Sequence, residues 1–148
     1  MIVVMPERDF AALQSSIEGS RKAVVTDLPQ VLLAIFGAIA VNDFESLAAH
    51  FTADTELHIH GFSLFDGAWH GRDAVMAAIK HNFYKITEQK PLVESMVHEN
   101  NVIAVRIHET GLLTSNSQRY ELAGVIWFTF EGSQVRRIDE YLHSISGH

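Results

Sequence analysis

The chain has 148 residues, of which 47% are hydrophobic and 20% charged, and it carries a formal net charge of −7. These values are typical of a single folded domain, and a negative chain without a basic run is a poor partner for nucleic acid or anionic membranes. The sequence contains no cysteine, which excludes disulfides, thiol catalysis and thiolate metal sites.

The N-terminal segment begins with a short apolar run that Pro6 interrupts. A secretory signal needs a basic start and a longer apolar core, so we predict a cytoplasmic protein. We expect residues 1–27 to form an extension with a short helix over residues 7–18. Residues 28–148 are expected to form the main domain.

The first half of this domain is predicted to be mainly helical. Asp27 can cap a helix over residues 28–41, in which Pro29 is tolerated because it falls in the first turn. Asp43 can cap a shorter helix over residues 44–51, and a third helix is expected over residues 71–84. Between these helices, residues 56–60 alternate with a period of two and predict a strand, followed by a loop or ragged strand as far as His70.

After Pro91 only strands are predicted, over residues 92–98, 102–112, 120–130 and 135–142. These segments are rich in β-branched and aromatic residues and are bounded by turn residues, as expected of antiparallel strands. Residues 131–134 can form the hairpin between the last two. Helices first and strands last indicate an α+β domain with helices on one face of an antiparallel sheet.

Two short motifs carry a resemblance to a known family. Phe-x-x-Asp begins at Phe51, before the first strand, and Gly-Arg-Asp-Ala-Val begins at Gly71, at the start of the third helix. With this order of elements, residues 28–143 resemble the nuclear-transport-factor-2-like superfamily, especially its SnoaL-like branch, the relatives of polyketide cyclase, ketosteroid isomerase and limonene-epoxide hydrolase. The resemblance implies a cone-shaped α+β roll, in which a curved antiparallel sheet wraps three to four helices. It also implies an apolar pocket and a homodimer through the outer sheet face.

Comparison with the catalytic positions of ketosteroid isomerases argues against their mechanism in this chain. Their tyrosine donor, carboxylate base and protonated carboxyl correspond here to Ile35, Ile59 and Ile126, none of which can transfer a proton. These isoleucines would instead make the pocket apolar, so we expect it to bind a small apolar molecule without a cofactor. The expected substrate-binding residues are Ile35, Ile39, Ile59, Trp69, Ile79, Ile126 and Phe128.

The resemblance to limonene-epoxide hydrolase implies a different catalytic set. Arg106 and His108 stand two apart on a predicted strand and therefore share a face, which the family register turns into the pocket. Arg106 would stabilise an anion or oxygen, His108 would act as base, and Glu140 would be the orienter or second acid/base. His108 stands where the hydrolase has an acid. The expected function is cofactor-independent hydrolysis, cyclisation or isomerisation, and the alternative is a non-catalytic hydrophobic-ligand-binding domain.

The direction of the strand over residues 102–112 stays open from the residues alone. Ile103, Val105 and Ile107 can equally form its core side, which would leave Arg106 and His108 in solvent. With Arg106 and His108 turned inward, the opposite face would instead be a dimer surface built from Val105, Ile107, Val125 and Trp127.

The last strand has a similar ambiguity. A plain two-residue turn would direct Asp139 and Tyr141 into the pocket, whereas one β-bulge would direct Ile138 and Glu140 there. We favour Glu140, because Ile138 and Leu142 form the more natural inward pair.

A histidine pair on the first strand raises the question of a metal. His58 and His60, with Glu56, share one face of that strand. Leu57 and Ile59 form its natural core side, so we interpret these histidines as surface or interface residues and expect no metal.

Overall fold

The computed structural model describes residues 27–145, so the helix predicted over residues 7–18 lies outside the described residues. The helices are α2 (Leu28–Ala40), α3 (Phe44–Ala49) and α4 (Arg72–Tyr84). The strands are β1 (Phe51–His60), β2 (Gly67–His70), β3 (Ile86–Glu99), β4 (Val102–Leu113), β5 (Arg119–Glu131) and β6 (Gln134–Ser144). None of the helices in this part of the chain has the length and apolar character needed to span a bilayer.

The observed elements match the predicted ones in type and order, although two strands begin several residues earlier than expected. Phe51, which we placed at the end of a helix, is the first residue of β1, and β3 already begins at Ile86. The Asp27 side chain accepts a 3.3 Å hydrogen bond from the Gln30 backbone N–H. The Asp43 side chain accepts one of 3.1 Å from that of Ser46. Both predicted caps are therefore confirmed, because each satisfies a backbone donor that the first helical turn leaves unpaired.

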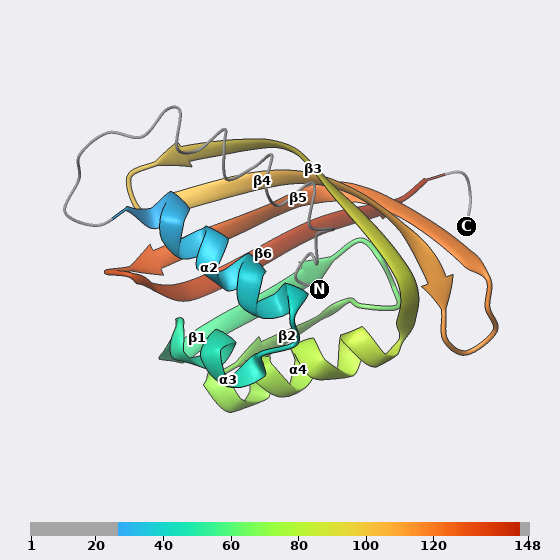
Figure 1. Cartoon of the computed structure of the whole chain (residues 1–148), viewed down its shortest axis with the longest axis horizontal. Helices are drawn as coiled ribbons and strands as arrows, with labels where there is room; N and C mark the ends of the chain where they lie inside the picture. Colours follow the sequence, from blue (N-terminus) through green and yellow to red (C-terminus); the bar gives the residue numbers. More distant parts are fainter. Residues whose placement is uncertain (1–26, 146–148) are drawn as a thin grey trace.

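The six strands form one sheet in the order β2-β1-β6-β5-β4-β3. Strands β1 and β6 run parallel, whereas the other neighbours in this sheet are antiparallel. Figure 1 shows the long strands arching over α2, with α4 lying beside β1 and β2. The sheet therefore has an inner face covered by helices and an outer face that no helix covers in the described residues.

The core lies between the inner face and the helices. Alternate residues of β4, namely Ile103, Val105 and Ile107, are fully buried there. The ring of Phe36 from α2 packs edge-on against Phe128 of β5, with ring centroids 6.0 Å apart. Burying an apolar side chain of this size contributes about 1.5–3 kcal/mol, so this layer holds α2 against the sheet.

The direction of β4 corrects the expectation drawn from the family resemblance. Val105 pairs with Ile126 and Arg106 pairs with Val125 across the β4–β5 ladder, and directly opposite residues share a face. Because Ile126 is buried in the core, the odd-numbered residues of this part of β4 point inward and Arg106 points outward.

The expected dimer surface was accordingly wrong for two of its four residues. Val105 and Ile107 belong to the core, whereas Val125 and Trp127 do lie on the outer face. A shift of one residue in the pairing register of a strand moves every side chain to the other face of the sheet.

The last strand follows the alternative with a β-bulge. The ladder between β5 and β6 pairs Phe130 with Val135 and then Thr129 with Arg137, so the register shifts by one residue. Glu140 is consequently buried on the inner face and Asp139 lies on the outer face. The inward direction expected for Glu140 is confirmed.

Candidate functional site

Four polar side chains meet the apolar inner face of the sheet. Gln89 comes from β3, Glu109 from β4, Tyr120 from β5 and Glu140 from β6, and we call them the interior carboxyl cluster. Both glutamates are 0% exposed and Tyr120 is 2% exposed. Burying an ionisable side chain costs free energy of folding, so two buried glutamates on one face of the sheet make this cluster a candidate functional site.

Glu109 is held by two side-chain hydrogen bonds. The Tyr120 hydroxyl donates to its Oε2 at 2.6 Å, and the Gln89 side-chain amide donates to its Oε1 at 2.9 Å. Gly111 faces Tyr120 across the β4–β5 ladder, and a Cβ there would lie 2.6 Å from a ring carbon of Tyr120. The missing side chain at Gly111 therefore leaves room for the tyrosine that bonds Glu109.

Burial changes the proton affinity of all three ionisable members of this cluster. Burial raises the pKa of Glu109 to about 7, against the lowering effect of its hydrogen bonds from Tyr120 and Gln89, and the charge of Glu140 raises it as well. Burial also raises the pKa of Glu140 to about 7. The pKa of Tyr120 lies above its ordinary value because of burial and the neighbouring Glu109. At neutral pH the two carboxyls can therefore accept or release a proton, while Tyr120 is a neutral donor.

An open cleft of about 960 Å³ reaches the cluster at Tyr120. Its walls come from the loop after β1, including Phe62 and Leu64, and from the adjoining ends of β4 and β5. The ring centroid of Phe62 lies 6.1 Å from that of Tyr120. Within the loop, the Asp66 side chain accepts a 2.8 Å hydrogen bond from the Phe62 backbone N–H.

Arg106 and His108 do not join this cluster, which corrects the predicted convergence of Arg106, His108 and Glu140. The Arg106 side chain is 62% exposed, with its guanidinium 3.9 Å from Glu94. The His108 imidazole lies 2.7 Å from Glu121, which shares the outer face with it. Of the three predicted catalytic residues, Glu140 alone points to the inner face.

Most of the predicted substrate-binding residues are buried in the core. Six of them are buried with at most 2% exposure, namely Ile35, Ile39, Ile59, Ile79, Ile126 and Phe128. Trp69 is half-buried on β2. The cleft at Tyr120 has a different lining, which includes Phe62, Leu64 and Leu113.

Sequence reasoning missed Glu109, Tyr120 and Gln89. A signal for Glu109 was present, because it continues the period-two row of Ile103, Val105 and Ile107 and so extends the core side of the strand. The hydrogen bonds to Gln89 and Tyr120 join different strands, and no local pattern indicates them.

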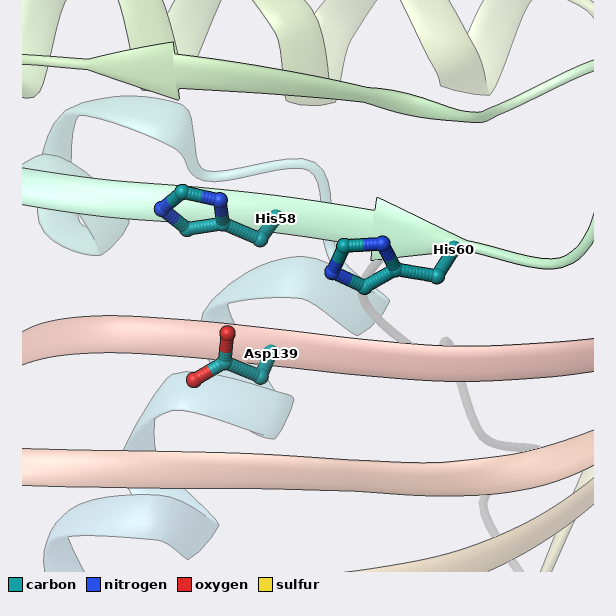
Figure 2. Close-up of side chains that lie close together, drawn as sticks. All are labelled: His58, His60 and Asp139. Carbon is teal, nitrogen blue, oxygen red and sulfur yellow. The ribbon is translucent and has the colours of Figure 1, made fainter.

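On the outer face, the histidine pair of β1 meets an acidic residue of β6. One donor atom each from His58, His60 and Asp139 lies within 4.8 Å of the others. Figure 2 shows both imidazoles and the carboxylate on the same side of the two neighbouring strands. This group has the residue types of a divalent-metal site and lies opposite the interior carboxyl cluster.

The curved sheet wrapped around three helices defines an NTF2-like α+β fold. Similar solved structures include NTF2-like proteins from Burkholderia pseudomallei and Burkholderia xenovorans, each with a TM-score of 0.68 over 78% of this chain. Their identities are 20% and 23%, and the matches cover 90% and 88% of those chains. A protein with a ketosteroid isomerase-like fold from Catenulispora acidiphila, in complex with trimethylamine, has a TM-score of 0.64 and 12% identity over 76% of this chain and 85% of its own.

The family is identified from the sequence match. A family model described as the SnoaL-like domain matches residues 32–138, which is most of the chain. The protein belongs to this SnoaL-like family. No curated protein matches the chain.

Proposed function

We propose that this protein is a cofactor-independent enzyme that acts on a small apolar molecule by general acid/base catalysis. The observation that carries this proposal is the pair of buried carboxyls, Glu109 and Glu140, each with a pKa of about 7. Groups with a pKa near the working pH are the most effective proton donors and acceptors. The reaction would be an isomerisation, cyclisation or hydrolysis.

Tyr120 would connect the substrate to the carboxyls, because it lines the cleft and contacts Glu109. When Glu109 is protonated, its own O–H can donate to the Tyr120 oxygen. The phenolic O–H then becomes available to an oxygen of a substrate in the cleft. Glu109 would thus supply a proton through Tyr120, and the apolar wall formed by Phe62 and Leu64 would bind the rest of the molecule.

Deuterium exchange into simple carbonyl compounds tests this proposal. A panel of enolisable cyclic ketones in D₂O is followed by NMR with the wild type and with Glu109→Gln, Glu140→Gln and Tyr120→Phe. We expect the wild type to exchange the α-protons faster than buffer alone. Replacing the acid or the base should lower this exchange rate by roughly 100-fold or more. Arg106→Ala should behave as the wild type, because Arg106 lies on the outer face. Equal exchange with the wild type and all three interior variants would contradict the proposal.

The alternative is a domain that binds an apolar ligand without catalysis. It is favoured by one observation, namely that both oxygens of Glu109 already accept hydrogen bonds from the protein. If this carboxyl is structural, an apolar fluorescent dye should bind in the cleft, and Glu109→Gln should bind the dye with the affinity of the wild type. Neither protein should then catalyse exchange.

We also propose that a second copy of the chain covers the outer sheet face, as the family resemblance implies. Trp127 is 44% exposed there, and Tyr141 is exposed on the neighbouring strand β6. Val97 is exposed on the same face, on β3, with Ala104 of β4 between it and Trp127. Apolar side chains on both faces of a one-layer sheet favour a second cover. Light scattering should report a dimer for the wild type and a monomer for Trp127→Glu. Tyr84→Glu, which changes an exposed ring on α4, should stay dimeric.

A further inference from the structure

We propose that His58, His60 and Asp139 form a binding site for a divalent transition-metal ion, with Zn²⁺ as the best-fitting ion. One ligand atom from each residue lies within 4.8 Å of the other two. Two neutral imidazoles and one carboxylate are a common donor set for Zn²⁺, and three protein ligands leave a fourth position for water or another ligand.

The backbone brings these residues together. His58 and His60 are two apart on β1 and therefore project from the same face. Strand β6 runs parallel to β1, and its register places Asp139 directly opposite His58. Leu57 and Ile59, between and beside the histidines, are buried in the core, so the strand cannot rotate its histidines away from this face.

Neighbouring rings and charges hold the three ligands in place. The His60 ring stacks on Tyr141, with centroids 5.0 Å apart and planes inclined by 15°. The Arg137 guanidinium donates hydrogen bonds to both carboxylate oxygens of Asp139, at 2.9 to 3.1 Å. Glu56 Oε1 lies 3.3 Å from His58 Nε2. Such outer contacts orient metal ligands in known sites.

The charge balance of this surface also favours a cation. Glu56 and Asp139 contribute two negative charges, and Arg137, which lies within 3.9 Å of both carboxylates, contributes one positive charge. The remaining negative charge lies beside the two imidazoles. Tetrahedral Zn²⁺ ligands lie roughly 3.4 Å apart at the usual bond lengths, so small side-chain rotations bring the three donor atoms onto one ion.

The proposed site does not depend on the proposed acid/base function. Asp139 and Glu140 are adjacent on β6 but point to opposite faces of the sheet. A metal ion bound by His58, His60 and Asp139 would instead cross-link β1 to β6, the parallel pair of the sheet. We therefore expect metal binding to stabilise the fold, whether or not the inner face is catalytic.

Zinc titration of the chelator-treated full-length protein tests the site. Isothermal calorimetry should show one Zn²⁺ per chain, and the thermal unfolding temperature should rise with zinc. His60→Ala and Asp139→Asn should each weaken zinc binding by roughly 100-fold and reduce the thermal shift, because the first removes an imidazole ligand and the second removes the negative charge of the carboxylate ligand. His81→Ala, which removes an exposed histidine on α4, is the matched control and should bind like the wild type.

Two further measurements keep the test decisive. Circular dichroism of the metal-free variants establishes that they are folded. Asp139→Asn also changes the contacts with Arg137, so if this variant is unfolded, the test rests on His60→Ala. Cobalt substitution should give a visible absorption spectrum of bound Co²⁺ in the wild type that His60→Ala lacks. No zinc binding at millimolar concentration, or equal binding by wild type, His60→Ala and Asp139→Asn, would overturn the proposal.

Discussion

The Tyr120 hydroxyl donates a 2.6 Å hydrogen bond to Oε2 of Glu109, and both side chains are buried on the inner face of the sheet. This bond connects the wall of the cleft to a carboxyl that lies behind it. Because the bond is short and buried, it affects both the stability of the fold and the proton affinity of Glu109. A buried acceptor that loses its donor cannot form a hydrogen bond with water in its place.

Replacing Tyr120 by phenylalanine should weaken the fold and raise the pKa of Glu109. The change leaves a buried carboxyl oxygen without its donor, which costs about 1–3 kcal/mol of unfolding free energy. In the wild type the hydrogen bond from Tyr120 lowers the pKa of Glu109, so the loss of this bond should raise that pKa. Urea denaturation and an NMR titration of the Glu109 carboxyl measure the two effects. Tyr84→Phe, at a site 76% exposed, should change neither.

The stability of the protein should depend on pH through Glu140. Burial raises the pKa of this carboxyl from 4.5 to about 7 in the folded state, so between these values the folded chain holds a proton that the unfolded chain has released. The contribution of Glu140 to stability is therefore full below pH 4.5 and is lost as the pH rises through 7. Relative to Glu140→Gln, the wild type should lose roughly 3 kcal/mol over this interval. Urea denaturation across the pH range measures the difference, and a constant difference would contradict the expectation.

Replacing Gly111 by alanine should displace the Tyr120 ring. The added methyl carbon would lie 2.6 Å from a ring carbon and 2.7 Å from the hydroxyl oxygen of Tyr120. We expect a loss of about 1–3 kcal/mol from this overpacking, together with the hydrogen bond to Glu109. In a Tyr120→Leu background the contact is absent, so Gly111→Ala should then cost much less. Additive effects in this double-mutant cycle would show that the two residues do not interact.

Replacing Arg106 by alanine should leave the protein nearly unchanged. Its side chain is largely exposed, and its ion pair with Glu94 is 3.9 Å long. Exposed pairs of this kind contribute about 0–1 kcal/mol, so the free energy of unfolding should stay within about 0.5 kcal/mol of the wild type. Dye binding in the cleft should also be unaltered. A large loss of unfolding free energy or of dye affinity would contradict the outward placement of Arg106.

Much of the fold could be predicted from local patterns in the sequence. Asp27 and Asp43 cap α2 and α3 as expected, because capping depends on the residues of a single turn. The inward direction of Glu140 could also be predicted, since Ile138 and Leu142 point the same way and the hydrophobic row selects the bulged register. The family resemblance led to the correct fold but to the wrong face for Arg106 and His108.

The sequence by itself determined the type and the order of the helices and strands, because apolar periodicity, caps and turns act over a few neighbouring residues. The tertiary structure alone decided which polar groups meet. The pairing of β4 with β5 directs Glu109 inward and Arg106 outward, and the parallel pairing of β1 with β6 places Asp139 beside His58. These relationships depend on strand register between distant segments, and register is set by how the whole sheet packs on its helices.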